Sequence, residues 1–97
     1  MKIVINECYG GFGLSDVAKK RYVELAGSAP NNWYTMSRSD KHLVQVVEEL
    51  GIEANGQCAF LRVHDIEAGC WYKIVEYGGR EEIKYKYQDT DWQLAVD

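Results

Sequence analysis

The hydrophobic positions in the first fifty residues predict one strand and two helices. Residues 2–7 carry apolar side chains on both faces, which is typical of a strand at the centre of its sheet. Residues 16–26 repeat apolar side chains with the helical period, and a second helix, capped by Ser39 or Asp40, extends to Leu50. The side chains expected to face the core are Leu14, Ala18, Tyr22 and Leu25 from the first helix, and Leu43, Val47 and Leu50 from the second.

The second half of the chain alternates between apolar and polar residues with a period of two, which predicts strands. One strand lies within 57–67, and two more, 70–77 and 80–87, flank the pair Gly78-Gly79. A Gly-Gly pair between two alternating runs is a strong signal for a two-residue hairpin. The tail, 91–96, alternates as well and predicts an edge strand, its apolar positions being Trp92, Leu94 and Val96.

The hairpin fixes a register in which Tyr77 faces Arg80. One face then carries the pairs Ile74–Ile83, Tyr72–Tyr85 and Cys70–Tyr87, and is expected to pack on the core. The opposite face carries the pairs Trp71–Lys86, Lys73–Lys84 and Val75–Glu82. Together these elements predict a single α+β domain over residues 1–97. Two helices pack on one face of a mixed or antiparallel four- to five-stranded sheet that includes a C-terminal β-hairpin.

Between the helices, residues 31–39 fit either a short strand or an ordered loop around Trp33–Met36.

Charge and cysteine content exclude several classes of protein. The 97 residues carry a net charge of −4, so the basic surplus of a nucleic-acid-binding protein or a polybasic membrane anchor is absent. No apolar run approaches the roughly 20 residues of a membrane-spanning helix. Three cysteines without CxxC spacing argue against a disulfide framework or a zinc site, and reduced thiols favour a cytosolic compartment. Neither histidine lies in a ligand-spaced cluster, so no metal or cofactor is expected.

A glycine-rich loop joins the first strand to the first helix and is one candidate ligand-binding site. It consists of Tyr9, Gly10, Gly11, Phe12 and Gly13, followed by the helix cap Ser15. Glycines let backbone N–H groups approach an anion, and the helix N-terminus behind them favours negative charge. Phe12 or Tyr9 would then stack on a base. The loop matches neither GxGxxG nor GK[ST], and a tight strand-to-helix turn explains the same residues. Both interpretations remain open.

The polar face of the predicted hairpin is the second candidate ligand-binding site, made of Trp71, Lys73, Lys84 and Lys86. Lys73 and Lys84 stand directly opposite each other, which is unfavourable unless an anion lies between them. Trp71 beside Lys86 predicts a cation–π pair or an aromatic shelf with a cation at its rim. The alternative is a solvated face on which Glu82 neutralises part of the charge.

Two further features of the sequence bear on chemistry. Cys8 follows the first strand near a helix N-terminus, which favours a thiolate, and it would need His42 or His64 beside it to act as a nucleophile. A small buried thiol is the commoner outcome, so no enzymatic activity is expected. Acidic residues gather in the second half of the chain, which fits a protein that presents carboxylates to a basic surface, or ordinary solubilising charge.

Two long motifs resemble a group of short proteins encoded by bacteriophages and prophages. They are K-I-V-I-N-x-C-Y-G-G-F-G-L-S at residues 2–15 and L-V-Q-V-V-E-E-L-G-x-x-A-N-G at 43–56, and the E-Y-G-G turn follows them. The resemblance covers most of the chain but not residues 29–39. Members of the group have no assigned activity, so no site residue is carried over. The resemblance implies a phage protein that acts in the host bacterial cytoplasm.

In that context we expect a non-enzymatic phage accessory protein that counters host defence by stoichiometric binding. The first expected partner is a small anionic, nucleotide-like ligand. The alternatives are inhibition of a host defence protein through an acidic surface, as anti-CRISPR proteins inhibit their targets, and a small enzyme that uses Cys8. No direct nucleic-acid or membrane partner is expected, and an exposed aromatic hairpin is compatible with a homodimer.

Overall fold

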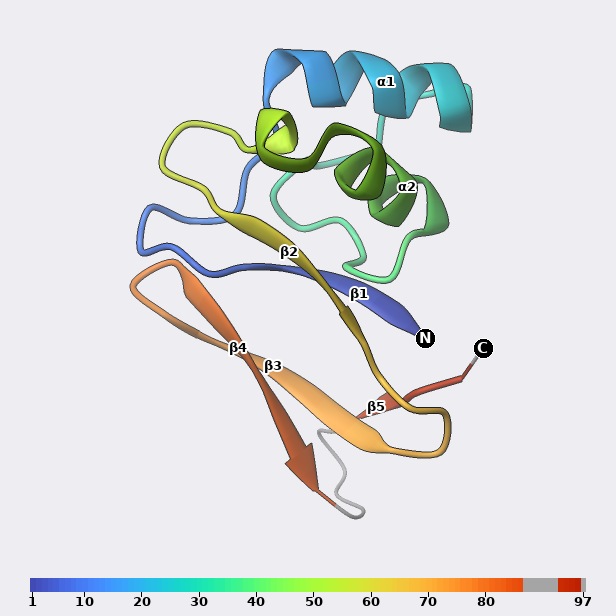
Figure 1. Cartoon of the computed structure of the whole chain (residues 1–97), viewed down its shortest axis with the longest axis vertical. Helices are drawn as coiled ribbons and strands as arrows, with labels where there is room; N and C mark the ends of the chain where they lie inside the picture. The colour runs from blue at the N-terminus through green and yellow to red at the C-terminus, as the bar shows by residue number, and fades with distance from the viewer. Residues whose placement is uncertain (87–92, 97) are drawn as a thin grey trace.

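A computed structural model describes residues 1–86 and 93–96 of the chain (Figure 1). The elements are β1 (Lys2–Asn6), α1 (Asp16–Ala26), α2 (Lys41–Leu50), the short 3-10 helix η1 (Gly51–Ala54), β2 (Leu61–Asp65), β3 (Trp71–Tyr77), β4 (Arg80–Lys86) and β5 (Gln93–Leu94). The α+β class, the two helices and the C-terminal hairpin are confirmed. The strands divide into two antiparallel sheets, β1-β2 and β4-β3-β5, where the sequence predicted one.

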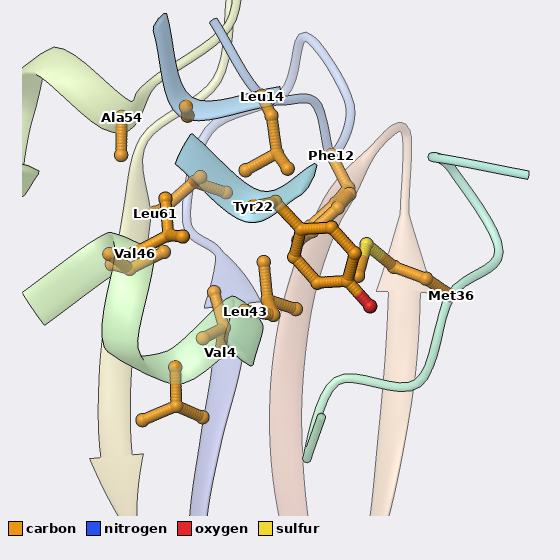
Figure 2. Packing of buried hydrophobic residues seen from close by; sticks show 12 residues of the cluster. Val4, Phe12, Leu14, Tyr22, Met36, Leu43, Val46, Ala54 and Leu61 are labelled. Atoms are coloured by element: carbon orange, nitrogen blue, oxygen red, sulfur yellow. The ribbon is translucent and has the colours of Figure 1, made fainter. Parts of the chain in front are cut away.

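β1 lies between two hydrophobic cores. Val4 faces a core that includes both helices and β2, and Figure 2 shows this side chain among the apolar residues of the helices. Ile3 and Ile5 face a second core formed with β3 and the tail. The prediction that this strand is central in its sheet is wrong, because among the described strands it pairs with β2 alone. Its burial on both faces comes from the layers above and below it (Figure 1).

Both helices begin and end where the sequence predicts. The Ser15 side chain accepts a hydrogen bond from the N–H of Ala18, at 3.1 Å, and Asp40 caps α2. Gly27 ends α1 with a φ of +86°, a backbone conformation that favours glycine. The predicted core stripe of α2 was too narrow, because Val44 and Val46 are buried as well.

The hairpin has the predicted register, with Tyr77 opposite Arg80 and Ile74 opposite Ile83. Its predicted inner face packs on the second core, except that 58% of Tyr85 is exposed. The pair Cys70–Tyr87 lies outside the described residues, because Tyr87 is not described.

The remaining segments were predicted less well. An edge strand does form from the tail, as β5 beside β3. However, Ala95 is the buried residue there, while Leu94 and Val96 are exposed and Trp92 lies outside the described residues. Residues 33–36 form a loop of turns, and Met36 reaches the first core.

Asn6, at the end of β1, joins both sheets and is fully buried. Its amide nitrogen donates to the C=O of Gly79, at 2.7 Å, and to the C=O of Cys8, at 2.7 Å. Its amide oxygen accepts from the N–H of Phe60, at 2.8 Å, and from that of Cys8. One side chain thereby connects the glycine loop, the hairpin turn and the segment that enters β2.

We expect Asn6→Ala to lower the free energy of unfolding by about 3 kcal/mol, because it leaves several buried backbone groups without partners. Urea unfolding followed by circular dichroism measures this. Asn31→Ala, at an exposed loop position, is the matched control and should change the free energy by less than about 0.5 kcal/mol. A loss in Asn6→Ala as small as that of the control would show that Asn6 does not hold the sheets together.

Candidate functional site

The glycine-rich loop packs closely against two other segments (Figure 1). A Cβ added at Gly10 would overlap Cys58, and a Cβ added at Gly79 would lie 2.6 Å from backbone atoms of Tyr9 and Gly11. The C=O of Gly13 accepts a hydrogen bond from the N–H of Gly56, at 2.9 Å. The glycines therefore allow backbones to approach each other, which favours the turn interpretation of this loop.

The aromatic and hydroxyl groups of the loop are also engaged inside the protein. Phe12 is 8% exposed, and the guanidinium of Arg38 lies 3.5 Å from the centre of its ring. Ser15 donates to the C=O of Glu53, at 2.6 Å, while it caps α1. Asp16 adds a negative charge to the first turn of α1. Of the predicted loop residues, Tyr9 alone combines an aromatic ring with high exposure, 71%.

Arg38 and Glu81 form a largely buried ion pair that sequence reasoning missed. Arg38 donates to a Glu81 carboxylate oxygen, at 3.1 Å, and to the C=O of Met36, at 2.8 Å. Glu81 also accepts from the N–H of Asn6, at 2.8 Å. A signal for Glu81 was present, because the register places this acidic residue on the same face as Ile83, where a carboxylate requires partners.

The outer hairpin face is the surface of β3 and β4 that points away from the second core. It comprises Trp71, Lys73, Val75, Tyr77, Arg80, Glu82 and Lys84. Lys73 and Lys84 are register partners, as predicted. Lys86 stands opposite Trp71 in the register, but its side chain lies outside the description.

Charges on the outer hairpin face are organised around Glu82. Arg80 donates to one Glu82 oxygen, at 2.6 Å, and the Lys84 ammonium lies 3.4 Å from the other. The hydrogen bond from Arg80, followed by that from Lys84, lowers the pKa of Glu82 below its usual value. Glu82 thus stays ionised and holds both cations on this face.

Both histidines contact residues other than the cysteines. His64 forms a hydrogen bond with Glu7, at 2.9 Å, and the His42 ring packs edge-on against Tyr22. The backbone of Cys8 is hydrogen-bonded to Asn6. Over residues 1–86 and 93–96, no group of three or more His, Cys, Asp or Glu side chains is arranged to hold a metal ion.

The acidic residues of the second half lie on several elements in the described part of the chain. Several of them pair with cations: Glu48 with Lys2, Glu49 with Arg21, Glu81 with Arg38, and Glu82 with Arg80 and Lys84. Asp89, Asp91 and Asp97 lie outside the described residues. These paired carboxylates therefore act as partners for the protein's own cations, and an acidic surface for a host protein stays a prediction.

Comparison with known proteins found no matching family model, no matching curated protein and no matching solved structure. No helix in the described residues is long and apolar enough to cross a membrane.

The close packing at the hairpin turn gives a test with a matched control. Gly79→Ala places a methyl group against backbone at a φ of +94°, so we expect a loss of about 3 kcal/mol in the free energy of unfolding. Gly78→Ala, at a φ of +59°, meets only the Tyr9 ring at 3.5 Å, and should cost about 1 kcal/mol. Urea unfolding compares the two variants. Equal losses would show that the glycine loop does not pack tightly against this turn.

Proposed function

We propose that this chain is a non-enzymatic binding protein that captures a small anionic, nucleotide-like ligand on the outer hairpin face. The observation that carries the proposal is the direct opposition of Lys73 and Lys84, with Trp71 on the same face. Two ammonium groups on neighbouring strands repel each other, and an anion between them removes that repulsion. Trp71 offers an aromatic surface on which a base can stack.

The charge balance of this face supports an anionic ligand. Among the described side chains, its cations are Lys73, Arg80 and Lys84 and its carboxylate is Glu82, whereas the whole chain carries a net charge of −4. A locally positive face on an acidic protein attracts anions to one place and disfavours the long polyanions that bind to uniformly basic proteins. The Lys84 ammonium already lies 3.4 Å from a Glu82 carboxylate oxygen, so a phosphate oxygen can take the place of that carboxylate.

The resemblance to phage and prophage proteins gives this binding a context. A small phage protein in the host cytoplasm can counter a defence system by sequestering the nucleotide signal on which that system depends. Such a role requires stoichiometric capture and no catalysis.

We expect Lys73→Glu to weaken binding of such a ligand at least tenfold, because it replaces a cation at the centre of the face with an anion. Native mass spectrometry with a panel of nucleoside phosphates and cyclic dinucleotides gives the affinities. Lys20→Glu, at an exposed position of α1, makes the same change of charge and is the matched control. If the parent protein and the control bind no nucleotide, the ligand site is not on this face. The same holds if the Lys73→Glu variant binds nucleotide as tightly as the parent protein and the control do.

A second candidate function, inhibition of a host protein, is favoured by two exposed tyrosines. Tyr9 and Tyr77 are 71% and 61% exposed, and Tyr9 lies beside Gly78 in the hairpin turn. Tyrosine is enriched in protein interfaces because its ring buries a large area while its hydroxyl forms hydrogen bonds. This candidate uses an exposed aromatic surface, and the acidic surface expected from the sequence stays a prediction.

If a host protein binds there, Tyr9→Ala combined with Tyr77→Ala should reduce its capture from bacterial lysate by at least tenfold. Tyr34→Ala removes another exposed tyrosine, 65% exposed and on the loop before α2, and should leave capture unchanged. Affinity purification followed by quantitative mass spectrometry compares the variants. Equal recovery by all of them would exclude this surface as the contact.

A further inference from the structure

β4 forms an edge of the second sheet and, among the described strands, pairs only with β3. Tyr77 and Arg80 flank the two-residue turn, so β4 residues bond to β3 at every second position, beginning with Arg80. The backbone groups at the other positions point away from β3. These outward positions are Glu81, Ile83 and Tyr85.

The outward edge of β4 is open in the described structure. A hollow of about 310 Å³ follows it, and its lining includes Glu7, which directly follows β1, and His64 of β2. Tyr85, at the same edge, is 58% exposed although it lies on the inner face of the hairpin. An open edge with unpaired backbone groups is a template for another strand.

We propose that a second copy of this chain pairs with this edge, β4 against β4 and antiparallel, about a two-fold axis at Ile83. In this register Ile83 faces Ile83 of the second copy, and Glu81 faces Tyr85. Every outward N–H and C=O of the three residues is then hydrogen-bonded, and the two three-stranded sheets become one continuous sheet.

The charges nearest the axis favour this register over the neighbouring two-fold ones. About Ile83, Glu82 of each copy stands opposite Lys84 of the other on the outer hairpin face, so the two pairs beside the axis are attractive, while Arg80 and Lys86 stand opposite each other at the strand ends. An axis at Glu81 would place two carboxylates against each other. An axis at Tyr85 would place Lys84 opposite Lys86.

Pairing also brings the two outer hairpin faces into one surface, with Glu82 and Lys84 of both copies at its centre. The inference stands on the edge of β4 and its charges, and it does not rest on the proposed ligand.

The test is a charge-reversal cycle read by sedimentation velocity over a range of protein concentrations, without ligand. Glu82→Lys alone, or Lys84→Glu alone, places like charges opposite each other, so each should weaken the dimer about tenfold. The double variant restores opposite charges and should return the dimer constant to within about twofold of the parent value. Glu53→Lys, at an exposed position of η1, is the control and should leave the constant unchanged.

Amide exchange followed by nuclear magnetic resonance gives a second readout that does not depend on substitution. Rising protein concentration should slow the exchange of the backbone amides of Ile83 and Tyr85. The amide of Lys84 is already hydrogen-bonded to β3, so its exchange rate should stay constant. The proposal is overturned if the protein stays a monomer at all concentrations, or if the double variant does not restore the dimer. It is also overturned if the exchange rate of the Ile83 amide does not change with protein concentration. Nucleotide binding by Lys73→Glu is measured separately, so failure of the dimer and failure of the ligand site can be distinguished.

Discussion

The buried side chain of Asn6 is the interaction on which the rest of this structure depends. An amide that is fully buried must find partners for its donor and its acceptor, because burial without hydrogen bonds is costly. Asn6 finds them in the hairpin turn at Gly79, in the glycine loop at Cys8 and at the entrance to β2 at Phe60. The side chain therefore fixes the position of the hairpin relative to β1, which no sheet hydrogen bond does.

The ion pair between Arg38 and Glu81 depends on that placement. The Glu81 carboxylate accepts a hydrogen bond from the N–H of Asn6 in β1. Arg38, on the loop before α2, donates to the same carboxylate while its guanidinium covers the ring of Phe12. Removing either charge would leave the other buried without compensation. The loop that contains Arg38 has no regular structure of its own, so these contacts hold it against both sheets.

The same arrangement decides which surfaces remain available for binding. The inner face of the hairpin covers Ile3 and Ile5, and the glycine loop is engaged with the turn, so the outer hairpin face and the edge of β4 are left at the surface. The cations of the proposed ligand site lie on β3 and β4, and the charges proposed to pair with a second copy lie on β4. The proposed ligand capture and the proposed self-association would therefore share Lys84.

The sequence by itself determined the local structure of this protein. Helix caps at Ser15 and Asp40 and the hairpin register around Gly78-Gly79 depend on residues within a few positions of one another, and a single sequence contains that information. The tertiary structure alone decided that β1 is covered by two layers, that Phe12 is buried under Arg38, and that Asn6 meets Glu81 across 75 positions of the chain. The physical reason is that a buried polar or aromatic group takes its partners from whatever the fold brings beside it. Sequence spacing does not encode those neighbours.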